Sequence, residues 1–476
     1  MTANPLAPDW LSLPGDANAL EPAIWSAGVE RSAEGVIQVA GVPVTQLARE
    51  YGTPLYVMDE ADVRTRAREA KLAFDREFAA VGSSAKVYYA GKAFLSTEVA
   101  RWVTEEGLHI DVASGGELAV ALAAGVDPAL LGVHGNNKSL REIDRAVASG
   151  AGVIVIDSVD EIARVADAAE QHGVRQRVRL RVNSGVHAST HEYLATARED
   201  QKFGIALADA EDVVALIRAR SSLEFMGLHA HIGSQIFEAV GFSESARRLM
   251  TLQARLLGDG PVPELNLGGG FGIAYTSADE AMQVADIARA LAEIVAAEAR
   301  RLGIPVPVVA VEPGRAIVGP STFTLYEVGT VKDVLVTIGG TTDDATAVRK
   351  YVSVDGGMSD NARTALYEAD YSVRLAARVS EAEPALVRVA GKHCESGDIV
   401  VRADYLPGDV RPGDLVAVPA TGAYCWSLSS NYNYLARPAV VAVRDGVSRI
   451  IVRGETEDDL LSRDAGIVRD TARNGN

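Results

Sequence analysis

The stretch 86–125, KVYYAGKAFLSTEVARWVTEEGLHIDVASGGELAVALAAG, contains two successive strand–helix units. Each short β-prone run stops at small residues and is followed by a segment whose apolar residues have helical spacing. The β-prone runs recur at 86–90, 108–113, 130–134, 152–157, 177–182, 225–232, 264–268 and 307–312. Eight such alternations predict an α/β fold built on a closed (β/α)8 barrel, with an open doubly wound sheet as the alternative.

The segments between these runs support helices. The longest, 278–303, carries a stripe of alanine and leucine that predicts an amphipathic helix. Several of these segments end in glycine, which is typical of a helix C-terminus. The polar stretch 190–203 interrupts the alternation and is expected to form a loop over the barrel mouth.

The composition changes after residue 319. Valine-rich runs separated by Gly, Pro and Asp occupy 324–336, 350–357, 385–401, 414–425 and 437–454. They predict a C-terminal all-β domain, and the strand-like stretch 35–59 is expected to pair into it. The predicted division is therefore 1–53 as an N-terminal segment that joins the β domain, 54–319 as the barrel, and 320–476 as the β domain.

Charge and cysteine usage narrow the class of protein. The 476 residues carry a net charge of −18, which disfavours nucleic acid and anionic membrane as partners. Only two cysteines, Cys394 and Cys425, are present, without the spacing of a zinc site or a disulfide framework. The first residues show neither a basic segment nor a long apolar run of a signal peptide. These features lead us to expect a cytoplasmic enzyme.

Ionisable residues and glycines gather at the predicted strand ends. In a (β/α)8 barrel the chemistry takes place where the strands finish. The residues at these positions are Lys92, Asp111, His134, Asp157, Arg181, Asn183, His231, Gly268–Gly270 and Glu312. Each alone fits a solvated rim, but their concentration on one face indicates a site.

Two motifs after the last two strands favour an anion. The glycines Gly268–Gly270 in LNLGGGFG allow backbone N–H groups to approach a phosphate, and barrel phosphate sites recur after strands seven and eight. The next motif, VEPGR, places the carboxylate of Glu312 at a strand tip and the cation of Arg315 beside it. Neither motif is specific alone, since a flexible turn and a rim ion pair would look the same. A dinucleotide fingerprint is absent.

The segment HAHIGS, 229–234, places His229 and His231 on one face of a strand. This spacing could bind zinc, but no third ligand follows at a matching distance, so we expect no metal. A flat imidazole could instead stack on an aromatic ring, and Ser234 could bind phosphate. We expect His229 to be an ordinary buried histidine.

These neighbouring motifs indicate a chemical role for Lys92. A desolvated lysine that faces a phosphate cradle and a carboxylate is the arrangement that covalent attachment of pyridoxal phosphate requires. The alternative for an isolated lysine at this position is a surface side chain.

Taken together, the motifs resemble a known family. They are YYAGKAF (88–94), HIDVASGGEL (109–118), HAHIGSQ (229–235), LNLGGGFG (265–272), VEPGR (311–315), DGGMSDNAR (355–363), CESGD (394–398) and TGAY (421–424). In this order, and over about 35–445, the chain resembles the fold-III pyridoxal-phosphate-dependent amino-acid decarboxylases. It is most similar to the members that convert meso-2,6-diaminopimelate to L-lysine and carbon dioxide. Gly91 stands where that family more often has serine.

The resemblance implies a role for each motif. Lys92 would carry pyridoxal 5′-phosphate, His231 would stack on its ring, and Glu312 would pair with its ring nitrogen. The remaining cofactor-binding residues would be Asp111, Ser234, Gly268, Gly269, Gly270, Pro313, Gly314, Arg315 and Tyr424.

Cys394 would reach the site from a second subunit and donate a proton to the product, which implies a homodimer with shared sites. A thiol is ordinarily protonated near neutral pH and suits this role. For the substrate, Arg315 and Arg363 would hold the distal carboxylate and Glu395 the distal ammonium. Tyr367 and Tyr424 would complete that site.

Other readings remain open. Relatives that decarboxylate arginine, ornithine or carboxynorspermidine share the cofactor machinery. A racemase on the same fold would have a tyrosine in place of Cys394. A catalytically silent homologue would typically lose the lysine, the cysteine or the glycines, and all three are present.

Overall fold

The structure is a computed structural model that describes residues 4–186, 202–338 and 345–467. Contacts divide the chain into two compact units. The barrel unit comprises residues 61–274 and 279–320, and the β unit comprises 1–60, 275–278 and 321–476. In the described residues no helix is long and apolar enough to cross a membrane.

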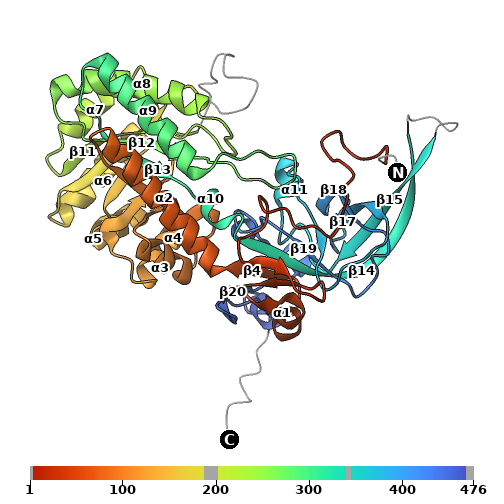
Figure 1. Cartoon of the computed structure of the whole chain (residues 1–476). Coiled ribbons are helices and arrows are strands. Elements are labelled where there is room, and N and C mark those ends of the chain that lie inside the picture. Colours follow the sequence, from red (N-terminus) through yellow and green to blue (C-terminus); the bar gives the residue numbers. More distant parts are fainter. Residues whose placement is uncertain (1–3, 187–201, 339–344, 468–476) are drawn as a thin grey trace, which may run out of the picture. The chain divides into compact units, whose positions relative to one another are not determined.

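The barrel unit confirms the predicted (β/α)8 barrel (Figure 1). Its strands are β5 (Ala85–Ala90), β6 (His109–Val112), β7 (Leu131–Val133), β8 (Val153–Ile156), β9 (Gln176–Asn183), β11 (Leu223–His229), β12 (Glu264–Gly269) and β13 (Val308–Glu312). All neighbours in this order are parallel, and β13 pairs with β5, which closes the barrel. The short β10 (Ile205–Ala206) adds to β9. All eight predicted runs are therefore barrel strands.

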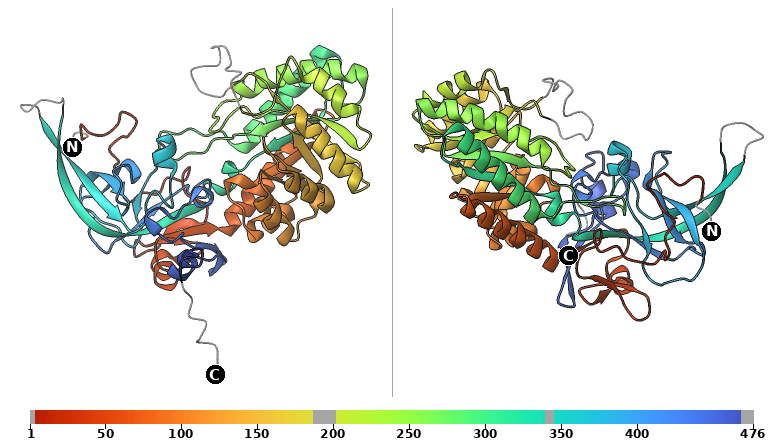
Figure 2. Two further views of the ribbon diagram at one scale, coloured as in Figure 1. Left: turned by 180° about the vertical axis from the view of Figure 1, so that it is seen from behind. Right: turned by 45° about the horizontal axis from the view of Figure 1, so that its top comes forward.

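Helices cover the outside of these strands (Figure 2). They are α2 (Glu60–Ala80), α3 (Thr97–Glu105), α4 (Gly115–Ala123), α5 (Leu140–Ser149), α6 (Val159–Gln171), α7 (Ala210–Arg218), α8 (Val240–Leu256), α9 (Val284–Leu302) and the short α10 (Arg315–Val318). The predicted glycine ends are confirmed at α5 and α9, where Gly150 and Gly303 are left-handed. The expected start of the longest helix at 278 is wrong, because Gln283 is extended and α9 begins at Val284.

The β unit has one large sheet. Its strands are β4 (Leu55–Asp59), β14 (Thr322–Thr337), β15 (Thr346–Val354), β16 (Arg374–Leu375), β17 (Pro384–Ala390), β18 (Ile399–Pro407), β19 (Leu415–Val418), β20 (Val440–Arg444) and β21 (Val447–Val452). Helices α11 (Arg363–Tyr367) and α12 (Glu457–Leu461) lie in the same unit. The predicted all-β domain with N-terminal strands is confirmed, because β4 pairs with both β14 and β20.

The N-terminal stretch is not strand throughout. The strands β1 (Val29–Arg31), β2 (Ile37–Val39) and β3 (Val42–Pro43) form a separate sheet. Residues 44–51 were expected as strand but form helix α1 (Val44–Tyr51), which buries Val44 and Leu47 three residues apart on one face. The contacts also place β4 in the β unit, whose N-terminal part ends at residue 60, seven residues after the end expected at 53.

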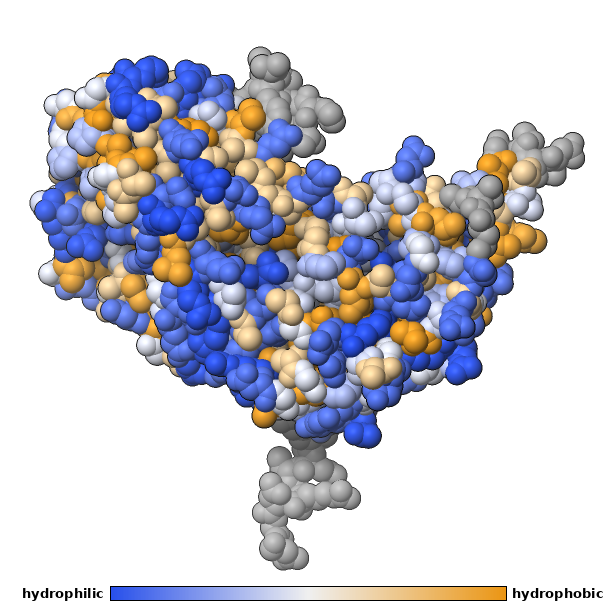
Figure 3. All heavy atoms as spheres, in the orientation of Figure 1, coloured by the Kyte–Doolittle hydropathy of each residue, from blue (hydrophilic) through white to orange (hydrophobic). Residues whose placement is uncertain are grey.

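The first residues pack onto the β unit. Leu11 is buried against Leu386 and Tyr405, with Leu6, Trp10 and Leu13 beside them. No pattern in the sequence predicts this contact. Elsewhere on the face seen in Figure 3, apolar side chains are interspersed with hydrophilic ones. The loop predicted at 190–203 lies outside the described residues except for its last two.

Candidate active site

Three adjacent strands carry the main candidates. The sheet order β12–β13–β5 places the glycine segment Gly268–Gly270, the carboxylate of Glu312 and the amine of Lys92 at consecutive strand ends. Because parallel strands end on the same rim, residues far apart in sequence meet there. The barrel thus brings together the three features that the sequence analysis connected.

Lys92 lies in a single 3₁₀ turn, Gly91–Ala93, directly after β5. Its side chain is exposed, so the expectation of a desolvated lysine is wrong for this chain by itself. Gly91 explains the small residue before it, because an added Cβ would lie 2.8 Å from the carbonyl oxygen of Asp111. The turn therefore presses tightly on β6 while the amine stays accessible.

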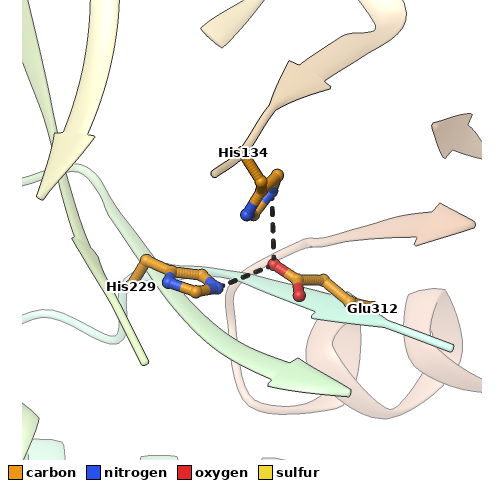
Figure 4. Close-up of side chains that lie close together, drawn as sticks. All are labelled: His134, His229 and Glu312. Carbon is orange, nitrogen blue, oxygen red and sulfur yellow. Dashed lines mark ion pairs between the residues drawn. The ribbon is translucent and has the colours of Figure 1, made fainter. Parts of the chain in front are cut away.

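Glu312 is the centre of a buried polar cluster (Figure 4). Its Oε1 lies 3.0 Å from Nε2 of His229 and 3.7 Å from Nε2 of His134. The amide Nδ2 of Asn266 donates to the same oxygen at 2.8 Å. Nε2 of His134 also lies 3.0 Å from Oδ1 of Asp111.

Burial and neighbours decide the charges in this cluster. Burial lowers the pKa of His134 and that of His229 to about 4, so both rings are neutral at pH 7. Burial, together with the charge of Glu312, raises the pKa of Asp111 well above its usual range. Burial by itself would raise the pKa of Glu312 as well, but His229 and His134 hold it well below its usual range. The negative charge of the cluster is therefore favoured on Glu312 over Asp111.

The same cluster bears on the metal question. His134, His229 and Glu312 each offer one ligand atom, and these atoms lie within 4.8 Å of one another. The spacing along the sequence did not reveal this cluster, because His134 follows β7 and Glu312 ends β13, both far from His229 in sequence. His229 is buried, as expected, and its ring also contacts Glu312. That the protein works without a metal stays a prediction.

The glycine segment packs tightly against neighbouring strands and forms hydrogen bonds within the protein. A Cβ on Gly269 would lie 2.0 Å from the carbonyl oxygen of Glu312, so only glycine allows β12 and β13 to approach this closely. The N–H of Gly268 donates to Oδ1 of Asn266 at 2.8 Å, and that of Gly269 donates to Nδ1 of His231 at 3.3 Å. Two of the N–H groups expected to bind phosphate thus have acceptors within the protein.

His231 has a fixed tautomer. Because Nδ1 accepts from Gly269, the proton of the neutral ring lies on Nε2. Burial, and the positive charge of Lys92, lower the pKa of His231 to about 3. A neutral, oriented ring is suited to stacking.

The remaining predicted residues of the barrel contact neighbours outside the Glu312 cluster. Arg315 is buried, and its guanidinium donates to Oγ of the exposed Ser234 at 2.8 Å. Pro313 and Gly314 form the buried turn before α10. Asp157 lies 3.8 Å from Arg181 and accepts from the N–H of Gly204, whereas Asn183 accepts from Gly185.

The predicted substrate and proton-donor residues belong to the β unit. Cys394 and Glu395 are exposed in the turn between β17 and β18, where the N–H of Cys394 donates to Asn433 at 3.1 Å. Tyr367 is 65% exposed, and Tyr424 is half-buried with a left-handed backbone, φ 64°.

Arg363, in contrast, is only 5% exposed. Its Nη1 donates to the hydroxyl of Tyr371 at 2.5 Å, and its guanidinium lies 4.5 Å from the centre of the Tyr275 ring. Burial alone would lower the pKa of Arg363, but Tyr371 and Tyr275 raise it, so the side chain is a buried cation.

Sequence reasoning missed three of these contacts. Asn266, Tyr275 and Tyr371 were not selected, although each touches a predicted residue. For Asn266 a signal existed: it is a polar residue within an apolar strand, two positions before the glycine segment and so on the same face as Gly268. No such pattern marks the two tyrosines.

The barrel residues fit one cofactor class. Pyridoxal phosphate offers an aldehyde, a ring nitrogen and a phosphate, and the three adjacent strand ends offer an accessible amine, an ionised carboxylate and a glycine segment next to Arg315 and Ser234. Fold and site therefore define a pyridoxal-phosphate enzyme of the barrel type.

Comparison with known proteins identifies the family. Residues 60–319 match the family described as "Pyridoxal-dependent decarboxylase, pyridoxal binding domain". The chain is 53% identical to the diaminopimelate decarboxylase of Mycobacterium tuberculosis (strain H37Rv), over 93% of this chain and 98% of the relative. It is 42% identical to that of Bacillus subtilis (strain 168), over 90% and 95%. The chain belongs to the pyridoxal-dependent decarboxylase family, among its diaminopimelate decarboxylases.

A solved structure supports the same family assignment. The diaminopimelate decarboxylase from M. jannaschii in co-complex with L-lysine has a TM-score of 0.84 and 30% identity to this chain, covering 93% of this chain and 98% of that one. The similarity therefore extends over both units and not the barrel alone.

Proposed function

We propose that the chain catalyses the decarboxylation of meso-2,6-diaminopimelate to L-lysine and carbon dioxide with pyridoxal phosphate as cofactor. One observation carries this conclusion: the identity of 53% to a diaminopimelate decarboxylase spans 98% of that relative. The site residues at the ends of adjacent barrel strands also fit pyridoxal phosphate, the cofactor that this reaction needs.

Lys92 and Glu312 have different proposed roles in the barrel: Lys92 attaches the cofactor, and Glu312 sets the charge of its ring nitrogen. When bound, pyridoxal phosphate supplies a sink for the electron pair left on the α-carbon after carbon dioxide departs. The exposed amine of Lys92 would hold the cofactor through a covalent bond. The ionised carboxylate of Glu312 would keep the ring nitrogen protonated, which would deepen the sink. His231 would support the ring, and the other residues proposed to bind the cofactor are Asp111, Ser234, Tyr424 and the glycine segment.

The β unit supplies specificity and the returning proton. Arg363 is a buried cation, and among the described residues no carboxylate forms an ion pair with it. Such a cation favours an anionic ligand, so Arg363, with Arg315, binds the distal carboxylate of the substrate. Glu395 reads the distal ammonium, Tyr367 and Tyr424 line the same site, and the thiol of Cys394 returns a proton to the α-carbon.

The substrate assignment is tested with purified protein and pyridoxal phosphate. Meso-diaminopimelate, arginine, ornithine and carboxynorspermidine are offered separately while carbon dioxide release is followed. We expect release from diaminopimelate alone. Release from arginine or ornithine would keep the cofactor assignment and overturn the roles of Arg363 and Glu395. Racemisation without release would favour the racemase alternative.

We also propose a homodimer in which each site takes Cys394 from the other subunit. Cys394 and Glu395 are exposed on this chain, which leaves them accessible to a second copy. Neither Cys394 nor Cys425 forms a disulfide bond within the described part of the chain, which supports the cytoplasm as the location.

Complementation tests the shared site. Lys92→Ala and Cys394→Ala variants, each inactive alone, are mixed, dissociated and reassociated. A mixed dimer contains one site with both residues intact, so about a quarter of wild-type activity should return. No recovery, with mixed dimers verified by mass, would mean that each site is built from one chain.

A further inference from the structure

The amide of Asn266 connects two parts of the site. Asn266 lies in β12, and none of its surface is exposed. Its Oδ1 accepts the N–H of Gly268, and its Nδ2 donates to Oε1 of Glu312, both at 2.8 Å. One side chain thus bonds both the glycine segment and the carboxylate at the neighbouring strand end.

The orientation of this amide follows from its partners. A backbone N–H only donates, so the atom that faces Gly268 must be the oxygen. The NH₂ group then faces Glu312, whose Oε1 must accept its hydrogen bond. This hydrogen bond favours the ionised form of Glu312, because a carboxylate is the stronger acceptor.

The strand register explains why Asn266 can do this. His229, Asn266 and Ala310 are aligned across β11, β12 and β13. Glu312 lies two residues after Ala310 and so on the same face of β13. Its carboxylate meets Asn266 from one neighbouring strand and His229 from the next.

We propose that Asn266 is a positioning residue that couples the glycine segment to Glu312, fixing the carboxylate as an oriented anion before the cofactor binds. The inference rests on the proposed function, because the ring nitrogen is what this anion would face. Asn266 itself touches neither substrate nor cofactor in this role.

The test measures the dissociation constant of pyridoxal phosphate for the cofactor-free protein, by absorbance and fluorescence. Asn266→Ala removes both hydrogen bonds, and we expect affinity to fall about 10- to 100-fold at every pH between 6 and 8.5. Gln176→Ala is the matched control. Gln176 is also a buried amide that bonds two backbone carbonyls, but it lies at the first residue of β9. It should cost stability without changing cofactor affinity.

Asn266→Asp should give a pH dependence of cofactor affinity that a purely structural role of Asn266 would not produce. When protonated, the new carboxyl presents the same acceptor to Gly268 and the same donor to Glu312. When ionised, it repels Glu312. The affinity of this variant relative to wild type should therefore recover as pH falls from 8.5 to 6. The other titratable or charged groups near Glu312 are His229, His134, Asp111, His231 and Arg181, and wild type measured at each pH accounts for them.

The outcomes separate the two proposals. Failure of wild type to bind pyridoxal phosphate would overturn the proposed function itself. Binding by wild type, with Asn266→Ala within threefold of it or Asn266→Asp showing no recovery at low pH, would overturn the role of Asn266 alone. Equal losses in Asn266→Ala and Gln176→Ala would reduce that role to stability.

Discussion

The barrel unit and the β unit each bury an ion whose nearest described neighbours are neutral, Glu312 in the first and Arg363 in the second, and the two charges have opposite signs. Glu312 in the barrel is an anion that accepts a hydrogen bond from Asn266 and lies beside the neutral rings of His229 and His134. Arg363 in the β unit is a cation surrounded by the rings and hydroxyl of Tyr275 and Tyr371. A buried ion without a countercharge is costly, so neutral groups that solvate it must be arranged in advance.

The sign of each buried charge indicates which ligand group the unit is suited to bind. The barrel anion suits a protonated ring nitrogen, and the cation of the β unit suits a carboxylate of the substrate. Neutral neighbours are essential, because an opposite charge supplied by the protein would compete with the ligand. In the proposed function, chemistry and specificity therefore depend on different buried ions in different units.

The largest effect should come from neither buried ion but from the exposed amine. Lys92→Ala removes the group that attaches the cofactor, so kcat should fall by about 10⁴-fold or more. The visible absorbance of the bound cofactor should shift at the same time. An unchanged visible spectrum in this variant would remove Lys92 from its assigned role.

Neutralising the barrel anion should have the next largest effect. Glu312→Gln keeps the shape but lowers kcat/KM about 10³-fold, because the ring nitrogen loses its partner. Asp111→Asn should cost much less, since burial and Glu312 raise the pKa of Asp111 and keep it neutral already. Comparable losses in both variants, measured by steady-state kinetics, would mean that the negative charge is shared.

Removing the cation of the β unit should change binding rather than cofactor chemistry. Arg363→Met should raise KM for diaminopimelate about 100-fold while the absorbance of the bound cofactor stays as in wild type. Arg411→Met, an exposed arginine of the same unit, serves as the control and should leave KM unchanged. Parallel loss of cofactor and substrate binding in Arg363→Met would contradict this assignment.

The smallest effect concerns pH. Burial lowers the pKa of His229 to about 4, against an ordinary value of 6.5, so the unfolded chain binds a proton more readily than the folded one. The stability of the cofactor-free protein should therefore fall as pH decreases from 6.5 to 4, by up to roughly 3 kcal/mol for this residue. His229→Gln should flatten that slope in thermal melts, and a slope equal to that of wild type would show that His229 is not its source.

Asp360 in the β unit should behave in the opposite way. Burial raises the pKa of Asp360 to about 7, so its contribution is complete below its ordinary value of 3.8 and is lost as pH rises through 7. Asp360→Asn should therefore remove a loss of stability with rising pH that extends over the whole interval from 3.8 to about 7, as measured by thermal melts.

Local patterns were sufficient to place most of this chain. Alternating periods of two and 3.6 located all eight barrel strands, and the strand ends named Lys92, Glu312 and the glycine segment. The pattern failed where tertiary contacts overrode it. Residues 44–51 form a helix because Val44 and Leu47 find a common buried face, and the N-terminal residues around Leu11 pack on β17 and β18.

By itself, then, the sequence determined which residues stand at the ends of strands, because the alternation of side chains along a strand is a local property. Only the tertiary structure decided which atoms meet. His134, His229 and Glu312 come from strands far apart in sequence, and closing the barrel brings their ligand atoms within 4.8 Å. The charge of each group follows from that proximity and from burial, and neither is visible in a linear pattern. The bridging amide of Asn266 and the tyrosines around Arg363 escaped detection for the same reason.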